Sequence, residues 1–432
     1  MKKVKVAVIG CGAIGAIHSE RYSKSPYAEL GAVVDIIPDR AESYAAKFGA
    51  GKALTDYKAM LKDPSIEAVS VCLPNDLHAP VTIAALQAGK HVLCEKPISI
   101  SLRKAMDMRA MAAKNKRTLA IGVVNRYNDN VNWIKDMISS GELGEVYHVH
   151  TMFKSHRSIP GLGGWFTTKE HSGGGVMLDW GVHFIDLILY CLGGPKPLSI
   201  SGAAYAKLGA KPKEYAYTNM WAGPPKLSGI CDVEEYVSGF LRTNGPTVAF
   251  EGAWAQNIGE DAKYIDFLGD KAGIRLNYGE SFTVYSHKNG RLYKTEPSMR
   301  TTDMFQNEID SFLLSTSGGK PCASDIDAVL PTQQVLDGFY SSAATGKEVR
   351  FAVIGAAATK PARSASAAAA KPARSAAAAK PAGSASAARS AVRPAGTGNA
   401  RAKGTAATAG DAKAVKPRPA RKPASRTKGP KA

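Results

Sequence analysis

The sequence lacks the patterns typical of a structural metal site and of a membrane-spanning segment. Its six cysteines lie far apart, with no C-x-x-C pair and no histidine doublet of zinc-ligand spacing, so we expect no metal site. No window approaches the roughly 18 uninterrupted apolar residues of a membrane span. The apolar residues 4–9 are broken by Lys5 and followed by glycines, unlike a signal peptide. These absences favour a soluble, cytoplasmic protein with reduced thiols and no membrane partner.

Acidic and aromatic residues are nearly absent from the end of the chain. Residues 355–432 hold 17 Lys and Arg, no aromatic residue and one acid, Asp411, so they carry +16 of the formal net charge of +19. Residues 1–354 keep only +3, which excludes a basic nucleic-acid-binding fold as the source of the charge. Because this tail is rich in Ala, Lys and Pro and has little apolar area to bury, we expect it to be disordered.

The charge of the tail also indicates a partner. A cationic, unstructured segment binds nucleic acid or another polyanion by releasing counterions, without sequence readout or base stacking. Such binding weakens at high salt. The alternative is a solubilising or fused appendage that has no part in catalysis.

The length of 432 residues predicts two or three domains. Over residues 1–125, short β-branched runs alternate with helix-like stretches, which is typical of a parallel sheet covered on both faces. The expected strands are 4–9, 30–34, 68–73, 91–94 and 119–124. The expected helices are 13–24, 39–48, 78–88 and 101–115. This pattern predicts an N-terminal Rossmann-like α/β domain.

Residues 126–354 are predicted to form a second, α+β domain. A helix from Val131 ends at the turn 140–144, and a glycine-rich loop at 158–175 precedes an apolar helix at about 176–192. Closely spaced β segments follow at 198–206, 233–241, 247–255, 263–268, 273–277 and 282–287. Their spacing favours a mainly antiparallel sheet, with helices near 303–315 and 325–345 closing the domain.

A glycine-rich turn follows the first strand. Gly10, Gly12 and Gly15 form a G-x-G-x-x-G pattern, which suits a tight turn, the approach of backbone N–H groups to a pyrophosphate, and packing of the helix on the strand. Asp35 ends the second strand, where its carboxylate suits ribose hydroxyls and repels a 2′-phosphate. The pattern favours NAD, and Arg40 leaves NADP open. A glycine-rich turn without a ligand is the alternative.

Polar residues follow two further strands of the predicted parallel sheet. Asn75 and His78 come after strand 68–73, and Glu95 and Lys96 come after strand 91–94. Both groups fall at the carboxyl ends of parallel strands, where open α/β sheets bind ligands. The next residue, a proline, disfavours a helical backbone at Lys96 and holds its ammonium on an extended or turning segment. The alternative for Lys96 is a solvated surface charge.

A carboxylate and an imidazole occur together in the predicted helix 176–192. If this segment is helical, Asp179 and His183 lie four residues apart on one face. A carboxylate next to an imidazole fixes its tautomer and stabilises its charged form, which suits a general base. Because the neighbours are apolar, a buried structural pair is the alternative.

In this order and at this spacing, these motifs resemble the glucose–fructose oxidoreductase / inositol dehydrogenase / rhizopine-catabolism (Gfo/Idh/MocA) family over about residues 3–350. The resemblance implies a Rossmann domain, followed by a domain whose open antiparallel sheet often mediates contacts in a homo-oligomer. It also implies oxidation or reduction of a secondary alcohol of a sugar or cyclitol with NAD(P).

The resemblance implies a role for each motif. Lys96 would hold and polarise the reacting oxygen, His183 would take the hydroxyl proton, and Asp179 would orient the substrate or the imidazole. Which of Lys96 and His183 accepts the proton stays open. The implied cofactor-binding residues are Gly10, Gly12, Gly15, Asp35, Asn75, His78 and Glu95.

Three residues are candidates for substrate recognition. Arg126 and Tyr127 follow the last Rossmann strand, and Trp165 lies in the glycine-rich loop. Aromatic faces and polar donors suit the C–H faces and hydroxyls of a carbohydrate. Packing at the domain interface is the alternative for each.

The predicted function is that of an NAD-dependent oxidoreductase. Hydride leaves a carbinol carbon only as its hydroxyl proton is removed, so a base and a cation must meet one oxygen above the nicotinamide. The substrate would be a secondary alcohol of a sugar, glycoside or cyclitol. The alternatives are a dinucleotide-sensing regulator whose basic tail binds nucleic acid, and a glycosidase or lyase that recycles NAD.

Overall fold

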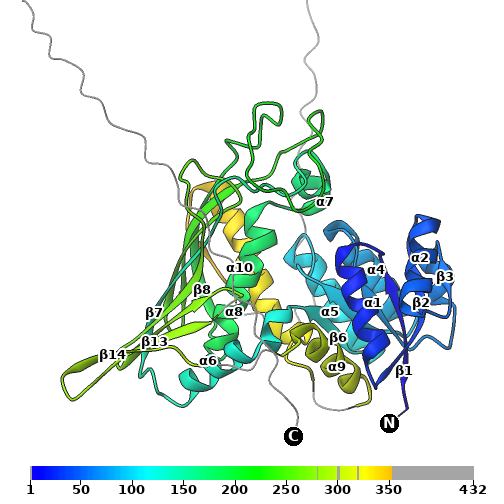
Figure 1. The fold of residues 1–432 in the computed structure, drawn as a ribbon, viewed down its shortest axis with the longest axis horizontal. Helices are drawn as coiled ribbons and strands as arrows, with labels where there is room; N and C mark the ends of the chain where they lie inside the picture. The colour runs from blue at the N-terminus through cyan, green and yellow to red at the C-terminus, as the bar shows by residue number, and fades with distance from the viewer. Residues whose placement is uncertain (1, 280, 299–301, 319–320, 353–432) are drawn as a thin grey trace, which may run out of the picture. The chain divides into compact units, whose positions relative to one another are not determined.

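The computed structural model describes residues 2–279, 281–298, 302–318 and 321–352 (Figure 1). The disorder predicted for the tail, residues 355–432, concerns a segment outside the described residues.

The first sheet is parallel and six-stranded, in the order β3-β2-β1-β4-β5-β6. Its strands are β1 (Val4–Ile9), β2 (Ala28–Val34), β3 (Ala53–Leu54), β4 (Ala68–Val71), β5 (His91–Glu95) and β6 (Leu119–Gly122). The helices around it are α1 (Ala13–Lys24), α2 (Pro38–Phe48), α3 (Tyr57–Leu61), α4 (Asn75–Gln87) and α5 (Leu102–Asn115). This strand order is the Rossmann arrangement, which confirms the predicted parallel sheet.

The second sheet has the order β14-β13-β12-β11-β7-β10-β9-β8-β15 in the described residues. Its strands are β7 (Val146–Lys154), β8 (Pro197–Tyr205), β9 (Tyr236–Thr243), β10 (Thr247–Ala253), β11 (Ala262–Gly269), β12 (Ala272–Asn277), β13 (Phe282–Lys288), β14 (Arg291–Thr295) and β15 (Val349–Arg350). Neighbouring strands run antiparallel except β7 and β10, which are parallel. The predicted mainly antiparallel sheet is therefore confirmed.

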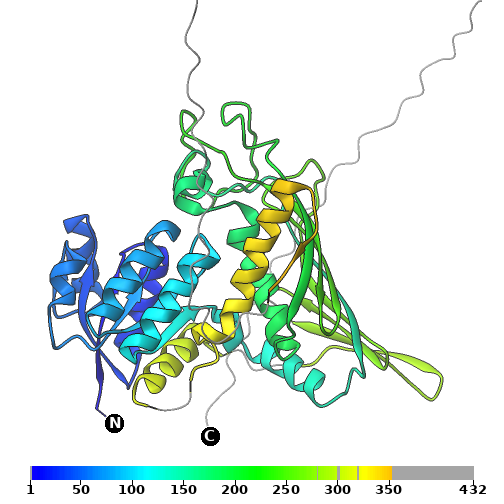
Figure 2. The ribbon, with the colours of Figure 1, turned by 180° about the vertical axis from the view of Figure 1, so that it is seen from behind.

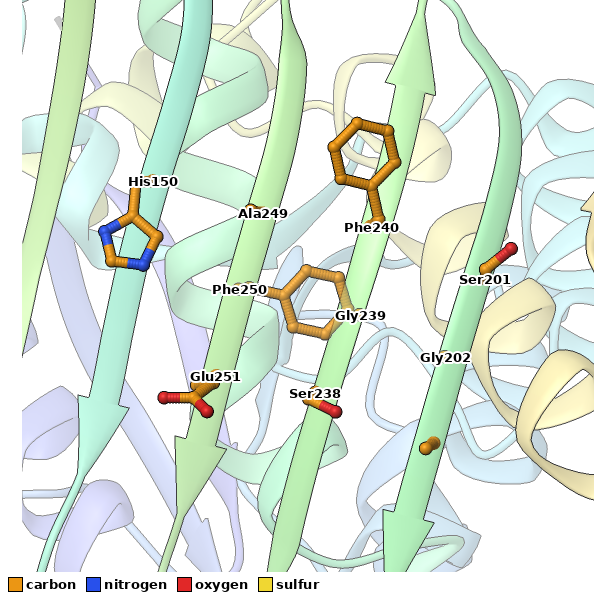
Figure 3. Close-up of a pocket in the computed structure, with 10 residues that line it drawn as sticks. His150, Ser201, Gly202, Ser238, Gly239, Phe240, Ala249, Phe250 and Glu251 are labelled. Carbon is orange, nitrogen blue, oxygen red and sulfur yellow. The ribbon is translucent and has the colours of Figure 1, made fainter.

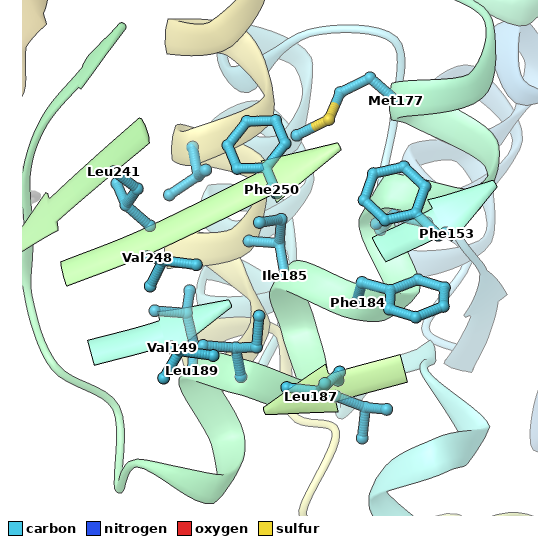
Figure 4. Packing of buried hydrophobic residues seen from close by; sticks show 14 of the residues in the cluster. Val149, Phe153, Met177, Phe184, Ile185, Leu187, Leu189, Leu241, Val248 and Phe250 are labelled. Atoms are coloured by element: carbon cyan, nitrogen blue, oxygen red, sulfur yellow. The ribbon is translucent and has the colours of Figure 1, made fainter. Parts of the chain in front are cut away.

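Helices cover one face of the second sheet. They are α6 (Asp129–Ser139), α8 (Val182–Cys191) and α10 (Ile326–Thr345), which lie between this sheet and the Rossmann sheet (Figures 1 and 2). Val149 and Val248 of the sheet share a buried cluster with Ile185 and Leu189 of α8 (Figure 4). Full burial of each such side chain contributes roughly 1.5–3 kcal/mol. This core fixes α8 on the sheet and so positions the residues at its start.

The opposite face of the second sheet carries a shallow depression of about 470 Å³. His150, Ser238, Phe240 and Glu251 lie along its strands (Figure 3). Within the described residues, no helix covers this face (Figures 1 and 2). The sheet is therefore open on one side.

Helix α9 (Met304–Thr316) belongs by packing to the first sheet. Its residues Ile309 and Phe312 are buried in one cluster with Val6 and Val8 of β1. The sequence alone assigns α9 to the second domain. Helical periodicity reveals an apolar face but not the sheet that the face will cover, so this contact was not foreseen. The boundary between residues 125 and 126 stays a prediction.

One helical segment of the described residues has the length and composition of a membrane span. It is Lys169–Cys191, and 83% of its apolar window is buried inside the protein. Such burial is that of a core helix. The six cysteines are free, and five of them are buried. The cytoplasmic location stays a prediction.

Candidate active site

The turn between β1 and α1 is built for close backbone contacts. Gly10 has φ +103°, and a Cβ atom there would collide with the carbonyl oxygen of Cys72 at the end of β4. A Cβ atom on Gly15 would collide with the carbonyl oxygen of Gly10. Beside Gly12 there is open space instead, because a Cβ atom there would have no heavy atom of the described residues within 4 Å. The turn therefore brings α1 close to β1 and leaves room above Gly12.

The start of α1 fits the diphosphate of a dinucleotide. The first turn of this helix has no side-chain cap in the described residues, so its N–H groups remain open to an anion. Asp35, at the end of β2, accepts the N–H of Cys11 at 2.8 Å on one carboxylate oxygen and the N–H of Ile37 at 2.9 Å on the other. Because a carboxylate offers about four lone pairs, it retains acceptors for ribose hydroxyls. These residues fit the adenosine half of NAD.

Lys96 crosses from the Rossmann domain to the second domain. Its ammonium donates to a carboxylate oxygen of Asp179 at 3.0 Å and to the main-chain oxygen of Asp179 at 3.2 Å. The indole N–H of the fully buried Trp254 donates to the other carboxylate oxygen of Asp179 at 3.3 Å. An ammonium has three N–H groups, so one N–H of Lys96 is left for a ligand.

His183 lies close to Lys96 but is not bonded to Asp179 in the described structure. Its Nδ1 contacts the side-chain amide of Asn125 at 3.3 Å, and that amide also contacts the hydroxyl of Tyr278 at 3.0 Å. Burial and then the positive charge of Lys96 hold the pKa of His183 well below its ordinary value. The imidazole is therefore neutral at physiological pH. The predicted His–Asp contact is absent because Asp179 turns to Lys96.

Asp179 sits in a π-helical turn, Met177–Gly181, and not in the regular helix that we predicted. The segment is anchored by the buried Glu234, whose carboxylate accepts the N–H groups of Gly175 at 3.0 Å and Met177 at 3.2 Å. A wider turn changes the direction of successive side chains from that of the predicted α-helix. Such turns are frequent at functional sites.

Two contacts join the domains above the carboxyl end of β4. The amide of Asn75 donates to the main-chain oxygen of Ser172 at 2.8 Å, and His171 pairs with Asp76 at 3.2 Å. Ser172 belongs to the short helix α7 (Lys169–Ser172). Asn75 was predicted to line the nicotinamide end. Its amide instead ties α7 to the start of α4 at this edge of the sheet.

His78 and Glu95 were predicted to contact the cofactor, but their side chains point into the protein. The ring nitrogens of His78 lie 2.7 Å from the carbonyl oxygen of Pro97 and 2.8 Å from that of Leu73. Burial lowers the pKa of His78, but the sulfur of Cys94 and the two carbonyls outweigh it and raise the pKa to about 9. His78 thus holds together the loops after β4 and β5.

The carboxylate of Glu95 is bonded beneath the site. One oxygen lies 2.9 Å from Nε2 of the buried His18, and the other accepts the main-chain N–H of Lys96 at 3.1 Å. Nδ1 of His18 continues to the hydroxyl of Ser70 at 3.0 Å. Glu95 therefore supports the Lys96 backbone from below. Sequence reasoning missed His18, although it follows the glycine pattern on the same helix.

Arg126 and Tyr127 are not substrate-facing, contrary to our expectation. The guanidinium of Arg126 forms a two-pronged pair with Asp186 at 2.8 and 2.7 Å, and both side chains are almost fully buried. The hydroxyl of Tyr127 lies 3.0 Å from that of Ser324, also in the interior. Both residues pack domain elements together, which was the stated alternative. A short 3-10 helix, Val124–Tyr127, turns these side chains inward.

Trp165 lies at the surface in an aromatic cluster. Its ring centroid is 3.8 Å from that of Phe166, which is 5.0 Å from that of Trp221. Trp165 is 39% exposed and Trp221 is 49% exposed. Trp221 comes from the loop after β8, and no periodicity in that loop indicated its position.

Comparison with known proteins agrees with this geometry. Residues 4–123 match the model of an oxidoreductase family with an NAD-binding Rossmann fold, and residues 131–275 match the GFO/IDH/MocA C-terminal domain. The chain belongs to the Gfo/Idh/MocA family of oxidoreductases. Membership confirms the predicted resemblance and makes the protein an NAD(P)-dependent dehydrogenase that acts on CH–OH groups.

Relatives within the Gfo/Idh/MocA family act on sugars and cyclitols. The chain is 31% identical to D-glucoside 3-dehydrogenase of Escherichia coli K12 over 352 residues, which is 81% of this chain and 97% of that protein. It is 32% identical to myo-inositol 2-dehydrogenase of Thermotoga maritima over 44% of this chain and 55% of that protein. The fold is that of levoglucosan dehydrogenase in complex with NADH and levoglucosan, with a TM-score of 0.70, 20% identity and coverage of 81% of this chain and 99% of the solved chain.

Proposed function

We propose that this Gfo/Idh/MocA enzyme transfers a hydride between a secondary alcohol of a sugar, glycoside or cyclitol and the nicotinamide of NAD. One observation carries the proposal. The ammonium of Lys96 follows β5 and the imidazole of His183 lies in α8, and burial and then the charge of Lys96 lower the pKa of the histidine. A cation and a neutral base from separate domains therefore converge.

The two side chains have complementary tasks on one oxygen. The remaining N–H of Lys96 donates to the substrate oxygen and favours negative charge on it. Neutral His183 takes the hydroxyl proton, and Asp179 holds the ammonium in place through its 3.0 Å contact. NAD held at the turn of Gly10, Gly12 and Gly15 and by Asp35 would supply the hydride acceptor for the carbinol carbon. In the reverse direction His183 returns the proton to the oxygen.

The test is NADH formation, followed by absorbance, with NAD and a panel of inositols, aldoses and glycosides. The E. coli relative makes a D-glucoside the first compound to try. We expect Lys96→Ala and His183→Ala to lower kcat by roughly 10²–10⁴, the range of general acid–base catalysis. His287→Ala, on the exposed part of β13, is the matched control and should keep wild-type turnover.

The same assay separates the rival functions. A regulator would bind NAD but turn over none of the panel. A glycosidase or lyase that recycles NAD would release product without net NADH. Either result contradicts the proposal, and neither alternative is supported by the family's relatives named above.

We propose NAD in preference to NADP as the cofactor. The carboxylate of Asp35 stands at the end of β2 beside the turn of Cys11, where a 2′-phosphate would meet its negative charge. Isothermal titration calorimetry with both dinucleotides tests this preference. Equal or tighter binding of NADP would contradict it.

We propose that the cluster of Trp165, Phe166 and Trp221 contacts the substrate. Its two indoles stay largely exposed and would stack on the C–H faces of a pyranose ring or on an aglycone. Trp165 and Phe166 of the cluster precede α7, which is bonded to Asn75 at the ligand-binding edge of the first sheet. Specificity for extended glycosides over cyclitols would follow.

We propose that the open face of the second sheet joins copies of the chain. The half-buried Phe240 and the depression around it lie on this face (Figure 3). Sedimentation velocity should yield a dimer or larger oligomer, and Phe240→Glu should shift it toward monomer. A wild-type monomer would refute the proposal.

We also propose that the basic tail binds nucleic acid or another polyanion. The support is its charge of +16 over residues 355–432. The intact chain should bind duplex DNA with an affinity that falls steeply with salt, and a chain truncated after residue 354 should not. Equal binding by both proteins would exclude the tail as the site.

A further inference from the structure

Three separate segments meet at His183. Asn125 lies in the 3-10 helix Val124–Tyr127 after β6, and Tyr278 directly follows β12. The ring of Tyr278 stacks on Phe184, with centroids 4.6 Å apart, and Phe184 stacks on Phe153 at 4.9 Å. The phenol is thus fixed by the core of the second domain. Its hydroxyl is aimed at the amide of Asn125, 3.0 Å away.

The structure places Nδ2 of Asn125 toward both neighbours: it donates to the hydroxyl of Tyr278 at 3.0 Å and lies 3.3 Å from Nδ1 of His183. A half-turn of the amide presents either its nitrogen or its oxygen at that position, and the hydrogen bonds decide between them. If the atom were nitrogen, it would donate to both neighbours. The hydroxyl hydrogen of Tyr278 would then have no acceptor among the described residues.

The phenol of Tyr278 decides the orientation. Burial raises the pKa of Tyr278 to about 12, so the phenol keeps its hydrogen and needs an acceptor. The Tyr278 side chain is half-buried, and a donor that is buried without a partner costs about 1–3 kcal/mol. With the amide turned so that its oxygen takes the position of Nδ2, it would accept from the phenol and from Nδ1–H of His183. Both donors are then satisfied.

We propose that Asn125 and Tyr278 are positioning residues that keep the proton of neutral His183 on Nδ1 and leave Nε2 as the acceptor of the substrate proton. The inference rests on the proposed hydride transfer. It also assigns the proton acceptor, which the sequence left open between Lys96 and His183. In the opposite orientation Nε2 would carry the hydrogen, and His183 could only donate to the substrate oxygen.

The charged groups around His183 favour the neutral ring. Lys96 faces it from the loop after β5, and its charge opposes protonation. Asp179, on the preceding π turn, is engaged by Lys96 and Trp254. Asp186, one turn further along α8, is paired with Arg126. The remaining partners from the packed elements, Asn125 and Tyr278, are uncharged.

The chain contains a matched control pair. Tyr190 donates to the side-chain oxygen of Asn132 at 2.8 Å, so the same two residue types are hydrogen-bonded between α8 and α6. No described contact links Asn132 or the Tyr190 hydroxyl to His183. Changes to this pair therefore report on effects that do not pass through a bond to His183.

The direct test reads the tautomer without any turnover. Two-bond proton–nitrogen NMR spectra of the full chain, labelled with ¹⁵N-histidine, contain nine histidines, and His183→Gln assigns the resonance. We expect wild-type His183 to carry its proton on Nδ1. A proton on Nε2 in the wild-type protein overturns the proposal.

Variants test the effect on catalysis. Tyr278→Phe should lower kcat about fivefold with KM unchanged, because one ordinary hydrogen bond that fixes the amide is lost. Asn125→Asp places a carboxylate at Nδ1 and should move the acid limb of the kcat/KM profile up by about one to three pH units. Asn132→Asp and Tyr190→Phe should leave the profile unmoved. Equal shifts in both pairs would mean a general packing effect and contradict the proposal.

The outcomes separate this inference from the proposed function. If no panel compound reduces NAD, hydride transfer fails while the NMR result still decides the tautomer. If the wild type is active but Asn125→Asp keeps the wild-type pH profile, the positioning role fails and hydride transfer stands.

Discussion

Glu308 provides a sharp test of the buried electrostatics. This residue of α9 is fully buried, and neither carboxyl oxygen has a hydrogen-bond partner in the described residues. Burial, and next the charge of Glu95, raise its pKa well above the ordinary value. The native carboxyl is therefore neutral at pH values where the unfolded chain has an ionised one. Glu308→Gln keeps the shape and the neutral charge but does not titrate.

The magnitude follows from proton linkage. For an acid with a raised native pKa, stability falls as pH rises from the unfolded pKa, about 4.3, toward the native pKa. The slope is about 1.4 kcal/mol for each pH unit over which the native carboxyl stays protonated, so wild type should lose stability relative to Glu308→Gln as the pH rises from 5. Below pH 4 the stabilities of wild type and Glu308→Gln should depend on pH in nearly the same way.

Thermal unfolding of both proteins across this pH range measures the effect. Glu308→Gln should melt above wild type at pH 7, and the difference should shrink toward pH 5. Glu42→Gln, on the exposed face of α2, is the control and should give no pH-dependent difference. A constant difference between wild type and Glu308→Gln at pH 5 and pH 7 would show that Glu308 is ionised in the fold and refute the reasoning.

Three further predictions concern the cofactor, the substrate and the domain core. Asp35→Ser should weaken NAD binding roughly tenfold in calorimetry and reduce its preference over NADP, because charge-assisted bonds to the ribose are lost. Trp221→Ala should raise KM for an aryl glycoside about fivefold while leaving kcat unchanged, and a cyclitol should be unaffected. Asp186→Asn should lower stability by about 3–5 kcal/mol in denaturant unfolding, because it leaves the Arg126 charge buried without its partner. A wild-type midpoint in Asp186→Asn would refute that role.

Local sequence signals predicted most of the fold. The first strand and first helix, Val4–Ile9 and Ala13–Lys24, have the predicted bounds. Apolar alternation and glycine positions report on backbone geometry, which is local. The two-residue strand Ala53–Leu54 was missed because so short a strand leaves no periodic pattern. The helix predicted at 176–192 is interrupted by a π turn, which depends on Glu234, a residue distant in the chain.

The candidate site was only partly predictable, because many of its contacts also join residues that are distant in the chain. Motif positions indicated which residues lie at the ligand-binding edge, but not where each side chain points. Arg126 pairs with a residue 60 positions away, and Asn125 contacts one 153 positions away. Such partners are set by the packing of segments that are distant in the sequence, so they have no local signature. We therefore predicted that some polar residues bind ligands, although in the structure their side chains bond to other residues inside the protein.

The contacts of one carboxylate, that of Asp179, explain how a charged Lys96 and an uncharged His183 can lie in the same site. Hydride transfer needs a cation and an uncharged base at one oxygen, and a shared carboxylate would stabilise charge on both. Asp179 contacts Lys96 at 3.0 Å and gives its other oxygen to Trp254, so it supports the ammonium and leaves His183 without an anionic partner. The uncharged amide of Asn125 orients the imidazole instead. Asn125→Asp, which replaces that amide by a carboxylate, tests these separate roles directly, since only the pKa of His183 should change.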